Sequence, residues 1–199
     1  MRVRRVGRDA VLVECADADQ VRATYAEARR RVSARDIVPA AATVLIDGLA
    51  PGELASVIDD IGTWDTAPVA EDPGTPVELP VRYDGPDLAV VARLWECDTD
   101  EVARLHIECE FVVAFCGFAP GFAYCTGLPE RLWVPRRAEP RSRVPPGSVG
   151  LAGEFTGVYP TATPGGWQLV GHTDVELWRP DAEHPALLTP GTAVRFVDA

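Results

Sequence analysis

The amino-acid sequence predicts an α+β protein: a small two-layer α/β domain over residues 1–83, then a many-stranded β domain over residues 84–199. Strand and helix patterns alternate through the first domain, which is typical of a sheet covered by helices. In the second domain, residues 117–171 contain ten of the 17 glycines and eight of the 18 prolines. Short apolar pieces lie between these turn residues, and this pattern indicates a β-barrel or a β-sandwich.

Four segments of the first domain have a clear periodicity. Residues 10–15 (AVLVEC) and 43–47 (TVLID) are apolar and rich in β-branched side chains, which favours strands. Apolar residues recur at helical spacing over residues 19–33, and again after Pro51, which fits the first turn of a helix. We therefore expect a helix after each of these strands.

The first domain is predicted to close with one more strand. Residues 66–76 contain three prolines and are expected to be a loop or linker. Residues 77–83 (VELPVRY) then complete a βαβαβ order. Pro80 places this strand at an edge, because proline cannot donate a ladder hydrogen bond.

The second domain is predicted to begin with two helices. Pro86 fits the start of a helix that continues over residues 88–95, and Asp98 followed by Glu101 resembles a capping box for the next helix. Residues 110–118 (EFVVAFCGF) are expected to form a buried strand. Further short strands are expected at LWVP, SVGLAG, GWQLVG and AVRFV.

The charge of the chain excludes several classes of function. The net charge is −11 and the isoelectric point is about 4.7, whereas nucleic-acid-binding proteins carry the opposite balance, so we expect no nucleic-acid partner. All 19 basic residues are arginine. Without lysine the chain can form neither a Walker-type phosphate loop, which ends in Gly-Lys, nor a Schiff base.

Cysteine content and hydropathy indicate a cytoplasmic protein. The five cysteines include no CxxC pair and are expected to be reduced, mostly buried thiols. The longest apolar stretches, such as residues 111–115, are too short to span a bilayer. No apolar run of signal-peptide length follows the N-terminus, so we expect neither export nor contact with a membrane.

Three loops rich in glycine and proline are candidates for ligand binding: Gly117–Gly121, Pro145–Gly150 and Pro164–Trp167. Glycine allows positive φ angles and lets backbone N–H groups approach an anion closely. Each loop alone can equally be a barrel corner or a hairpin turn. Because three of them occur in one stretch, two of them with an aromatic residue, a binding cleft is favoured.

Residues 131–143 contain five arginines and one glutamate, a local charge of +4 in an acidic chain. The guanidinium group matches carboxylate and phosphate geometry. The cluster is therefore either an anion site, in the cleft or at a subunit joint, or a basic face exposed to solvent or to an acidic partner.

Histidine and serine are the remaining candidates for catalysis. His106 lies on the apolar face of its predicted helix, where a hydrogen-bonded core histidine is the default interpretation. His172 and Asp174 would share one face of a strand and could form a base–orienter pair. Ser148 lies in a G-S-x-G sequence, which is not the G-x-S-x-G elbow of serine hydrolases.

From Phe118 onward the chain contains the strings FAPGF, PRR-x-x-PR, GSVG-x-AG, TG-x-YP and TPGGW in this order. These motifs resemble the family of 5-oxoprolinase B-type subunits, which is also labelled allophanate hydrolase subunit 1 or Kip-type inhibitor of a sporulation sensor kinase. A weaker similarity extends upstream through the helix of His106. The resemblance implies an α+β N-terminal domain followed by a cyclophilin-like β-barrel domain.

Position by position, the resemblance implies a cleft in which His106, Arg137 and Ser148 are the catalytic candidates, with no metal ligands. Its substrate-binding residues would be Phe118, Pro120, Gly121, Tyr124, Arg141, Pro145, Gly147, Tyr159, Thr163, Pro164, Gly165, Gly166 and Trp167. The sequence departs from the family pattern at Cys125, Pro146, Glu154-Phe155 and His172-Thr173-Asp174. The changes at Glu154 and His172 bear on the choice of substrate.

The resemblance also implies a function. The chain would be a non-autonomous subunit of an ATP-dependent 5-oxoprolinase, which opens the lactam of 5-oxoproline to glutamate together with A-type and C-type subunits. ATP would be a co-substrate of the complex, with its Mg²⁺ in a partner subunit and nothing bound tightly. The alternative is a binding protein that inhibits a sensor histidine kinase through the barrel cleft. Allophanate hydrolysis by a Ser-Ser-Lys amidase is excluded, because the chain lacks lysine.

Overall fold

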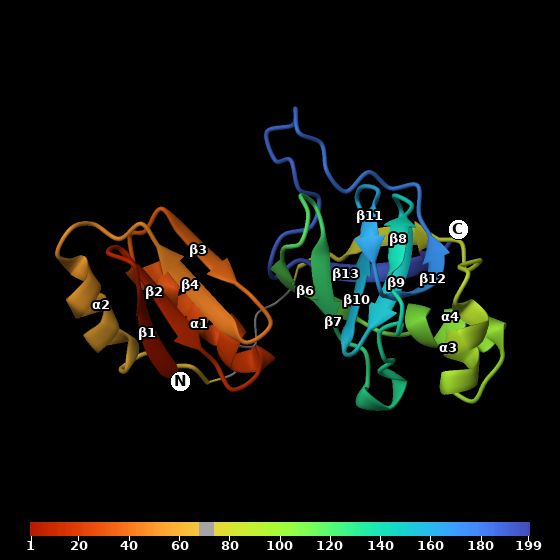
Figure 1. The fold of residues 1–199 in the computed structure, drawn as a ribbon, viewed down its shortest axis with the longest axis horizontal. Coiled ribbons are helices and arrows are strands. Elements are labelled where there is room, and N and C mark those ends of the chain that lie inside the picture. The colour runs from red at the N-terminus through yellow and green to blue at the C-terminus, as the bar shows by residue number, and fades with distance from the viewer. Residues whose placement is uncertain (68–73) are drawn as a thin grey trace. The chain divides into compact units, whose positions relative to one another are not determined.

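The computed structural model describes residues 1–67 and 74–199, and the chain divides into two compact units, Met1–Asp72 and Pro73–Ala199 (Figure 1). Each unit has a hydrophobic core of its own. Most of the loop expected over residues 66–76 lies outside the described residues. In the described part of the chain, no helix has the length and apolarity needed to cross a membrane.

The first unit consists of two successive ββα segments. Its strands are β1 (Arg2–Val6), β2 (Ala10–Glu14), β3 (Asp36–Pro39) and β4 (Thr43–Asp47), and its helices are α1 (Ala18–Arg31) and α2 (Glu53–Ile61). The sheet order is β1-β2-β4-β3, and all neighbours are antiparallel. The predicted βαβαβ order is therefore wrong, because β1 and β3 were missed. Both are edge strands that are largely exposed, so they lack the apolar signal of the two central strands.

One apolar face of this sheet explains the packing of both helices. Val11 pairs with Ile46 across β2 and β4, and these fully buried side chains lie on the same face because strand residues alternate between faces. Val21 of α1 and Ile61 of α2 belong to the same buried cluster. The prediction of a two-layer α/β unit is confirmed.

The second unit contains most of the strands. They are β5 (Val77–Val81), β6 (Phe111–Cys116), β7 (Ala123–Thr126), β8 (Arg141–Val144), β9 (Ser148–Ala152), β10 (Phe155–Val158), β11 (Thr163–Gly165), β12 (Gln168–His172) and β13 (Ala193–Asp198). The helices are α3 (Leu88–Leu94), α4 (Thr99–Ile107) and the short 3₁₀ helix η1 (Glu130–Leu132). The predicted cap of α4 is present, because Asp98 Oδ1 accepts a hydrogen bond of 2.8 Å from the Glu101 backbone.

Seven of these strands form one sheet in the order β12-β9-β10-β7-β6-β13-β5, and β8 pairs separately with β11. The strand over residues 77–83, expected to close the first unit, instead pairs in parallel with β13. The second unit therefore begins at Pro73, whereas the predicted second domain began at residue 84. Pro80 does lie in an edge strand, as predicted, but its partner strand is more than 100 residues away in the sequence.

The two edges of this sheet meet along a seam. Beyond β5, Arg82 exchanges two backbone hydrogen bonds of 2.9 Å with His172 in β12. The backbone N–H of Gly85 donates to Val170 (3.1 Å) and that of Asp87 donates to Leu169 (2.9 Å). The sheet thus curls into a nearly closed barrel, and the predicted α+β class with a β-barrel domain is confirmed.

Glycines make this seam possible. A Cβ atom on Gly171 would lie 2.3 Å from the Arg82 carbonyl oxygen, and one on Gly85 would lie 2.4 Å from the Leu169 carbonyl oxygen. Both contacts are far shorter than van der Waals separation and involve backbone atoms, which cannot rotate away. The two edges can therefore pair only where neither strand carries a side chain at these positions.

We predict that Gly171→Ala destabilises the second unit by roughly 1–3 kcal/mol, the usual cost of overpacking. Denaturant unfolding followed by tryptophan fluorescence would measure it, since four of the five tryptophans lie in this unit. Gly117→Ala is the matched control, because nothing lies within 4 Å of a Cβ atom there. Equal stability of the two variants would show that the seam is not closely packed.

Candidate functional site

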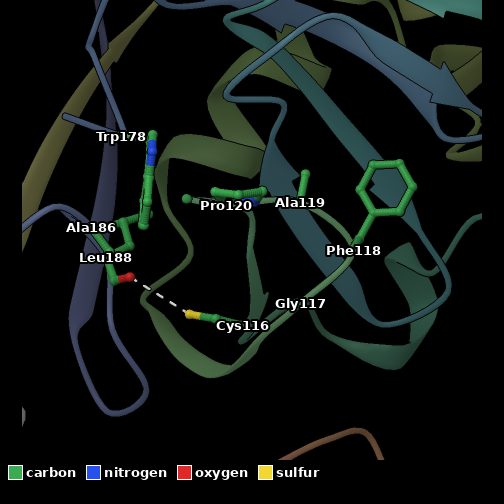
Figure 2. A pocket seen from close by; sticks show the side chains of 9 residues that line it. Cys116, Gly117, Phe118, Ala119, Pro120, Trp178, Ala186 and Leu188 are labelled. Carbon is green, nitrogen blue, oxygen red and sulfur yellow. Dashed lines mark hydrogen bonds between the residues drawn. The ribbon is translucent and has the colours of Figure 1, made fainter. Parts of the chain in front are cut away.

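The Gly117–Gly121 loop joins β6 to β7 and forms one wall of a surface pocket of about 430 Å³ (Figure 2). The opposite wall consists of Trp178, Ala186 and Leu188. Gly121 has a φ of +81°, and a Cβ atom there would lie 2.8 Å from Cβ of Trp178, so this position requires glycine. The structure thus brings three predicted binding residues to this pocket: Phe118, Pro120 and Gly121.

Phe118 has an unusual conformation in this loop. Its φ is +70°, a region that non-glycine residues rarely adopt, and 60% of the residue is exposed. Figure 2 shows its ring pointing away from Trp178. The ring instead makes edge contacts with Phe122 (5.4 Å between centroids) and Tyr159 (6.3 Å).

These contacts join Phe118 to an aromatic cluster that also contains Phe122, Tyr124, Tyr159 and Trp167. Ring centroids lie 5.1 Å apart for Phe122 and Tyr159, and 5.5 Å apart for Tyr124 and Trp167, all in edge-to-face geometry. Three predicted binding residues, distant in sequence, therefore pack in one cluster with Phe118. Tyr159 and Trp167 are buried, Tyr124 is half-buried and Phe118 is exposed.

Glycine lets Tyr159 reach the neighbouring strand. A Cβ atom on Gly165 would lie 2.5 Å from the Tyr159 hydroxyl oxygen, so the phenol occupies space that a side chain would fill. Burial raises the pKa of Tyr159, while a hydrogen bond from the Trp167 backbone and the charge of Arg136 act in the opposite direction. The Pro164–Trp167 loop is thus packed directly against the aromatic cluster.

Arg137 and Arg141 both bind the carboxylate of Asp87, which is 2% exposed. Arg137 Nη1 lies 2.7 Å and Arg141 Nη2 lies 2.8 Å from Asp87 Oδ1, while Oδ2 accepts a bond of 2.7 Å from the Leu169 backbone. Burial disfavours ionisation of Asp87, but the hydrogen bonds from Arg141 and Leu169 and the charges of both arginines outweigh it and lower its pKa. Arg137, predicted to be catalytic, and Arg141, predicted to bind substrate, are therefore already paired within the chain.

The Pro145–Gly150 loop is a turn whose polar groups are occupied. The Gly147 N–H donates to the Tyr159 carbonyl (2.7 Å), and the Gly147 carbonyl accepts from Thr173 (2.9 Å). The Ser148 hydroxyl is buried and donates to the Pro145 carbonyl (2.8 Å). This geometry does not support a catalytic role for Ser148, or an anion-binding role for the Gly147 amide.

The Thr163–Gly166 segment lies next to the aromatic cluster, because Gly165 packs against Tyr159. Gly166 accepts a backbone hydrogen bond of 2.8 Å from Arg137, while Thr163 and Pro164 lie in β11. The hydroxyl oxygen of Thr163 is buried and has no hydrogen-bond partner among the described residues. The segment therefore links the paired arginines to the aromatic cluster.

His106 lies in the interior of the barrel and is not part of the aromatic cluster. It is fully buried, and its ring packs 4.5 Å from that of Phe196 and 5.1 Å from that of Phe111. Nδ1 lies 2.8 Å from the Tyr83 hydroxyl, and Nε2 lies 3.0 Å from the Thr156 hydroxyl. The ring has no exposed atom to offer a ligand, so we assign His106 a structural role, as its place on an apolar helix face indicated.

The hydrogen bonds around His106 define its neutral tautomer. The Thr156 hydroxyl donates to the Gly150 carbonyl (3.3 Å), so it accepts from His106 Nε2–H. Nδ1 then accepts from the Tyr83 hydroxyl. Burial lowers the pKa of His106 to about 3, which keeps the ring neutral at physiological pH.

The predicted pair of His172 and Asp174 is not formed. His172 Nδ1 binds Asp84 Oδ1 at 2.9 Å, and Nε2 accepts from Arg82 Nε at 3.1 Å. Asp174 is exposed and lies 3.6 Å from the Arg82 guanidinium. The backbone bridge between Arg82 and His172 selects these partners, because it places the two side chains next to each other at the seam.

Sequence reasoning missed two residues that shape the site, Asp87 and Trp178. Arg136 lies in the predicted arginine cluster and in the PRR-x-x-PR motif, but it was not among the predicted site residues. Asp87 directly follows Pro86 at the N-cap position of α3, which is a recognisable signal for a side-chain cap. Its carboxylate makes no such cap and reaches across to β8 and β12 instead. No local pattern distinguishes these alternatives.

The fold of this chain is of the class found in carboxyltransferase-related domains. The model of the family "Carboxyltransferase domain, subdomain C and D" matches residues 1–188, so the chain belongs to this family. The crystal structure of TTHA0988 superimposes with a TM-score of 0.80 at 32% identity, covering 100% of this chain and 41% of that one.

Curated relatives confirm the resemblance seen in the motifs. The B-type subunit of 5-oxoprolinase from Escherichia coli O157:H7 is 56% identical over 124 residues, which cover 61% of this chain and 57% of the relative. Its counterpart from Bacillus subtilis strain 168 is 48% identical over 124 residues, covering 61% of this chain and 52% of the relative. The chain thus spans little more than half the length of the curated relatives it matches.

We predict that Asp87→Asn destabilises the second unit by roughly 3 kcal/mol, because removing one charge of a buried ion pair leaves its partners uncompensated. Asparagine keeps an acceptor for the Leu169 N–H, so denaturant unfolding would report the loss of charge. Asp174→Asn, at a carboxylate that is 86% exposed, is the control and should change stability little. Equal effects of the two substitutions would contradict a structural role for Asp87.

We predict that His106→Gln makes stability less dependent on pH. In the unfolded chain His106 takes up a proton below its ordinary pKa of about 6.5, whereas in the folded chain it stays neutral down to a pKa of about 3. The free energy of unfolding is therefore unaffected by His106 above about pH 6.5 and falls as the pH is lowered from there toward about 3. From pH 7 to pH 5 the wild type should therefore lose about 2 kcal/mol more than the variant. Denaturant unfolding at both pH values measures this difference, and parallel losses would exclude His106 as its source.

Proposed function

We propose that this chain is the B-type subunit of an ATP-dependent 5-oxoprolinase that acts in the cytoplasm with A-type and C-type subunits. The similarity to proteins named as B-type subunits of 5-oxoprolinase, at 56% and 48% identity, carries this proposal. The relatives do not favour the alternative of a sensor-kinase inhibitor, because both are named as subunits of the enzyme.

The chemistry of the reaction suits a surface that binds but does not itself catalyse. The lactam of 5-oxoproline is a poor electrophile, and phosphorylation of its carbonyl oxygen by ATP would activate it for attack by water. Such a reaction needs an apolar surface for the ring and cationic groups for the carboxylate and the phosphate. The exposed Phe118 and the half-buried Tyr124 of the aromatic cluster offer the apolar surface, and the arginine segment, residues 131–143, offers the cationic groups.

The state of the candidate catalytic residues supports action within a complex. The His106 ring and the Ser148 hydroxyl are buried and hydrogen-bonded inside the chain. A general acid or base must reach the reacting atoms, so the proposal assigns proton transfer to groups of the partner subunits.

ATP would be a co-substrate of the complex. In this chain arginine is the only side chain that carries a fixed positive charge toward phosphate, since lysine is absent. Within the described ranges, no three His, Cys, Asp or Glu side chains come together as a metal site requires. A partner subunit would hold the Mg²⁺ ion.

We predict that the chain alone shows no 5-oxoproline-dependent ATP hydrolysis, and that mixing it with its A-type and C-type partners restores hydrolysis with glutamate formed in step with ADP. Coupled assays of both products would measure this, with a mixture lacking this chain as the control. Turnover by the homogeneous chain would contradict dependence on partners. Equal turnover without the chain would contradict its membership of the complex.

A further inference from the structure

The arginine segment contains residues in different electrostatic situations. Arg137 and Arg141 are paired with Asp87. Arg131 is exposed, and its charge acts on the thiol of Cys109. Arg136 is also exposed, and within residues 1–67 and 74–199 no ion pair or side-chain hydrogen bond engages it.

Arg136 nevertheless has a defined place. A Cβ atom built on Gly166 would lie 3.6 Å from Arg136 Nη2, so the guanidinium lies over the glycine turn that precedes Trp167. Its charge acts on the phenols of Tyr124 and Tyr159, where it opposes the rise in pKa that burial causes. The unpaired guanidinium therefore lies beside the aromatic cluster.

Phe118 gives this surface an exposed apolar component. A positive φ is unfavourable for a non-glycine residue and persists where the surrounding structure imposes it, often at ligand sites. Here the strained backbone presents a ring that is 60% exposed, so burial of the ring does not offset the strain. The same ring contacts Tyr159, the phenol on which the charge of Arg136 acts.

We propose that Arg136 binds the carboxylate of a small ligand whose apolar body packs against Phe118 and the exposed part of Tyr124. The guanidinium can bind a carboxylate through two N–H groups, and no carboxylate of the described chain does so at present. Arg137 and Arg141 share one negative charge already and are less available. This inference deepens the proposed function, on which the choice of 5-oxoproline as a ligand rests.

Calorimetric titration of the full chain tests the inference, in buffer without carboxylate or phosphate and at low ionic strength. The probes are 5-oxoproline, its uncharged ring analogue 2-pyrrolidinone, and benzoate, a carboxylate on an apolar ring unrelated to the proposed reaction. The variants are Arg136→Gln and, as a matched control, Arg131→Gln, which removes another exposed arginine of the same segment. Phe118→Ala tests the apolar contact.

We expect the wild type to bind benzoate and to bind 5-oxoproline more tightly than 2-pyrrolidinone. Arg136→Gln should weaken binding of both carboxylates about tenfold or more, the scale of a lost charge-assisted hydrogen bond. Arg131→Gln should stay within about twofold of the wild type, because Arg131 is exposed, its charge acts on Cys109, and solvent screens it. Phe118→Ala should weaken benzoate and 2-pyrrolidinone alike, since its ring contacts the apolar body.

The inference is overturned if neither carboxylate binds, if Arg136→Gln binds both as the wild type does, or if Arg131→Gln loses as much affinity. Its failure is distinguishable from failure of the proposed function. A complex that turns over 5-oxoproline normally with Arg136→Gln would leave the function standing and remove the site. Benzoate binding that depends on Arg136, in a chain whose complex ignores 5-oxoproline, would keep the carboxylate site and remove the proposed substrate.

Discussion

The buried carboxylate of Asp87 lies between the barrel seam and the arginine segment, and it interacts with both. One oxygen accepts the Leu169 N–H, and the other binds Arg137 and Arg141. A buried carboxylate without such partners would cost several kcal/mol or become protonated. The start of α3, strand β12 and strand β8 must therefore form together, and a single charge couples segments that are 50–82 residues apart in the sequence.

This pairing also determines which arginines of the candidate site have a structural role and which one can bind a ligand. Two arginines of the segment neutralise Asp87, which leaves the exposed guanidinium of Arg136 beside the aromatic cluster. Glycines define the shape of the same region, because Gly165 leaves space for the Tyr159 hydroxyl and Gly166 lies under Arg136. Arg136 and Phe118 together can bind an anion that has an apolar body. His106, in the interior, is part of the core of the barrel instead.

Elements with strong local patterns were predicted well. The strand over residues 43–47 and the helices now seen as α1, α2 and α3 lie where periodicity placed them. The edge strands β1 and β3 were missed, since exposed strands have no alternating apolar signal. The partner of β5 was also missed, because parallel pairing with β13 depends on a contact between the two ends of the second unit.

The amino-acid sequence by itself determined the two-unit α+β organisation, the absence of lysine chemistry and, through its glycine and proline motifs, the family. It also placed His106 on an apolar helix face, which the structure bears out. Only the tertiary structure decided which arginines are paired, which edge closes the barrel and which residues form the aromatic cluster. The reason is physical: local propensity acts over a few neighbouring residues, whereas ion pairing, burial and strand partners depend on groups that meet only when the chain has folded.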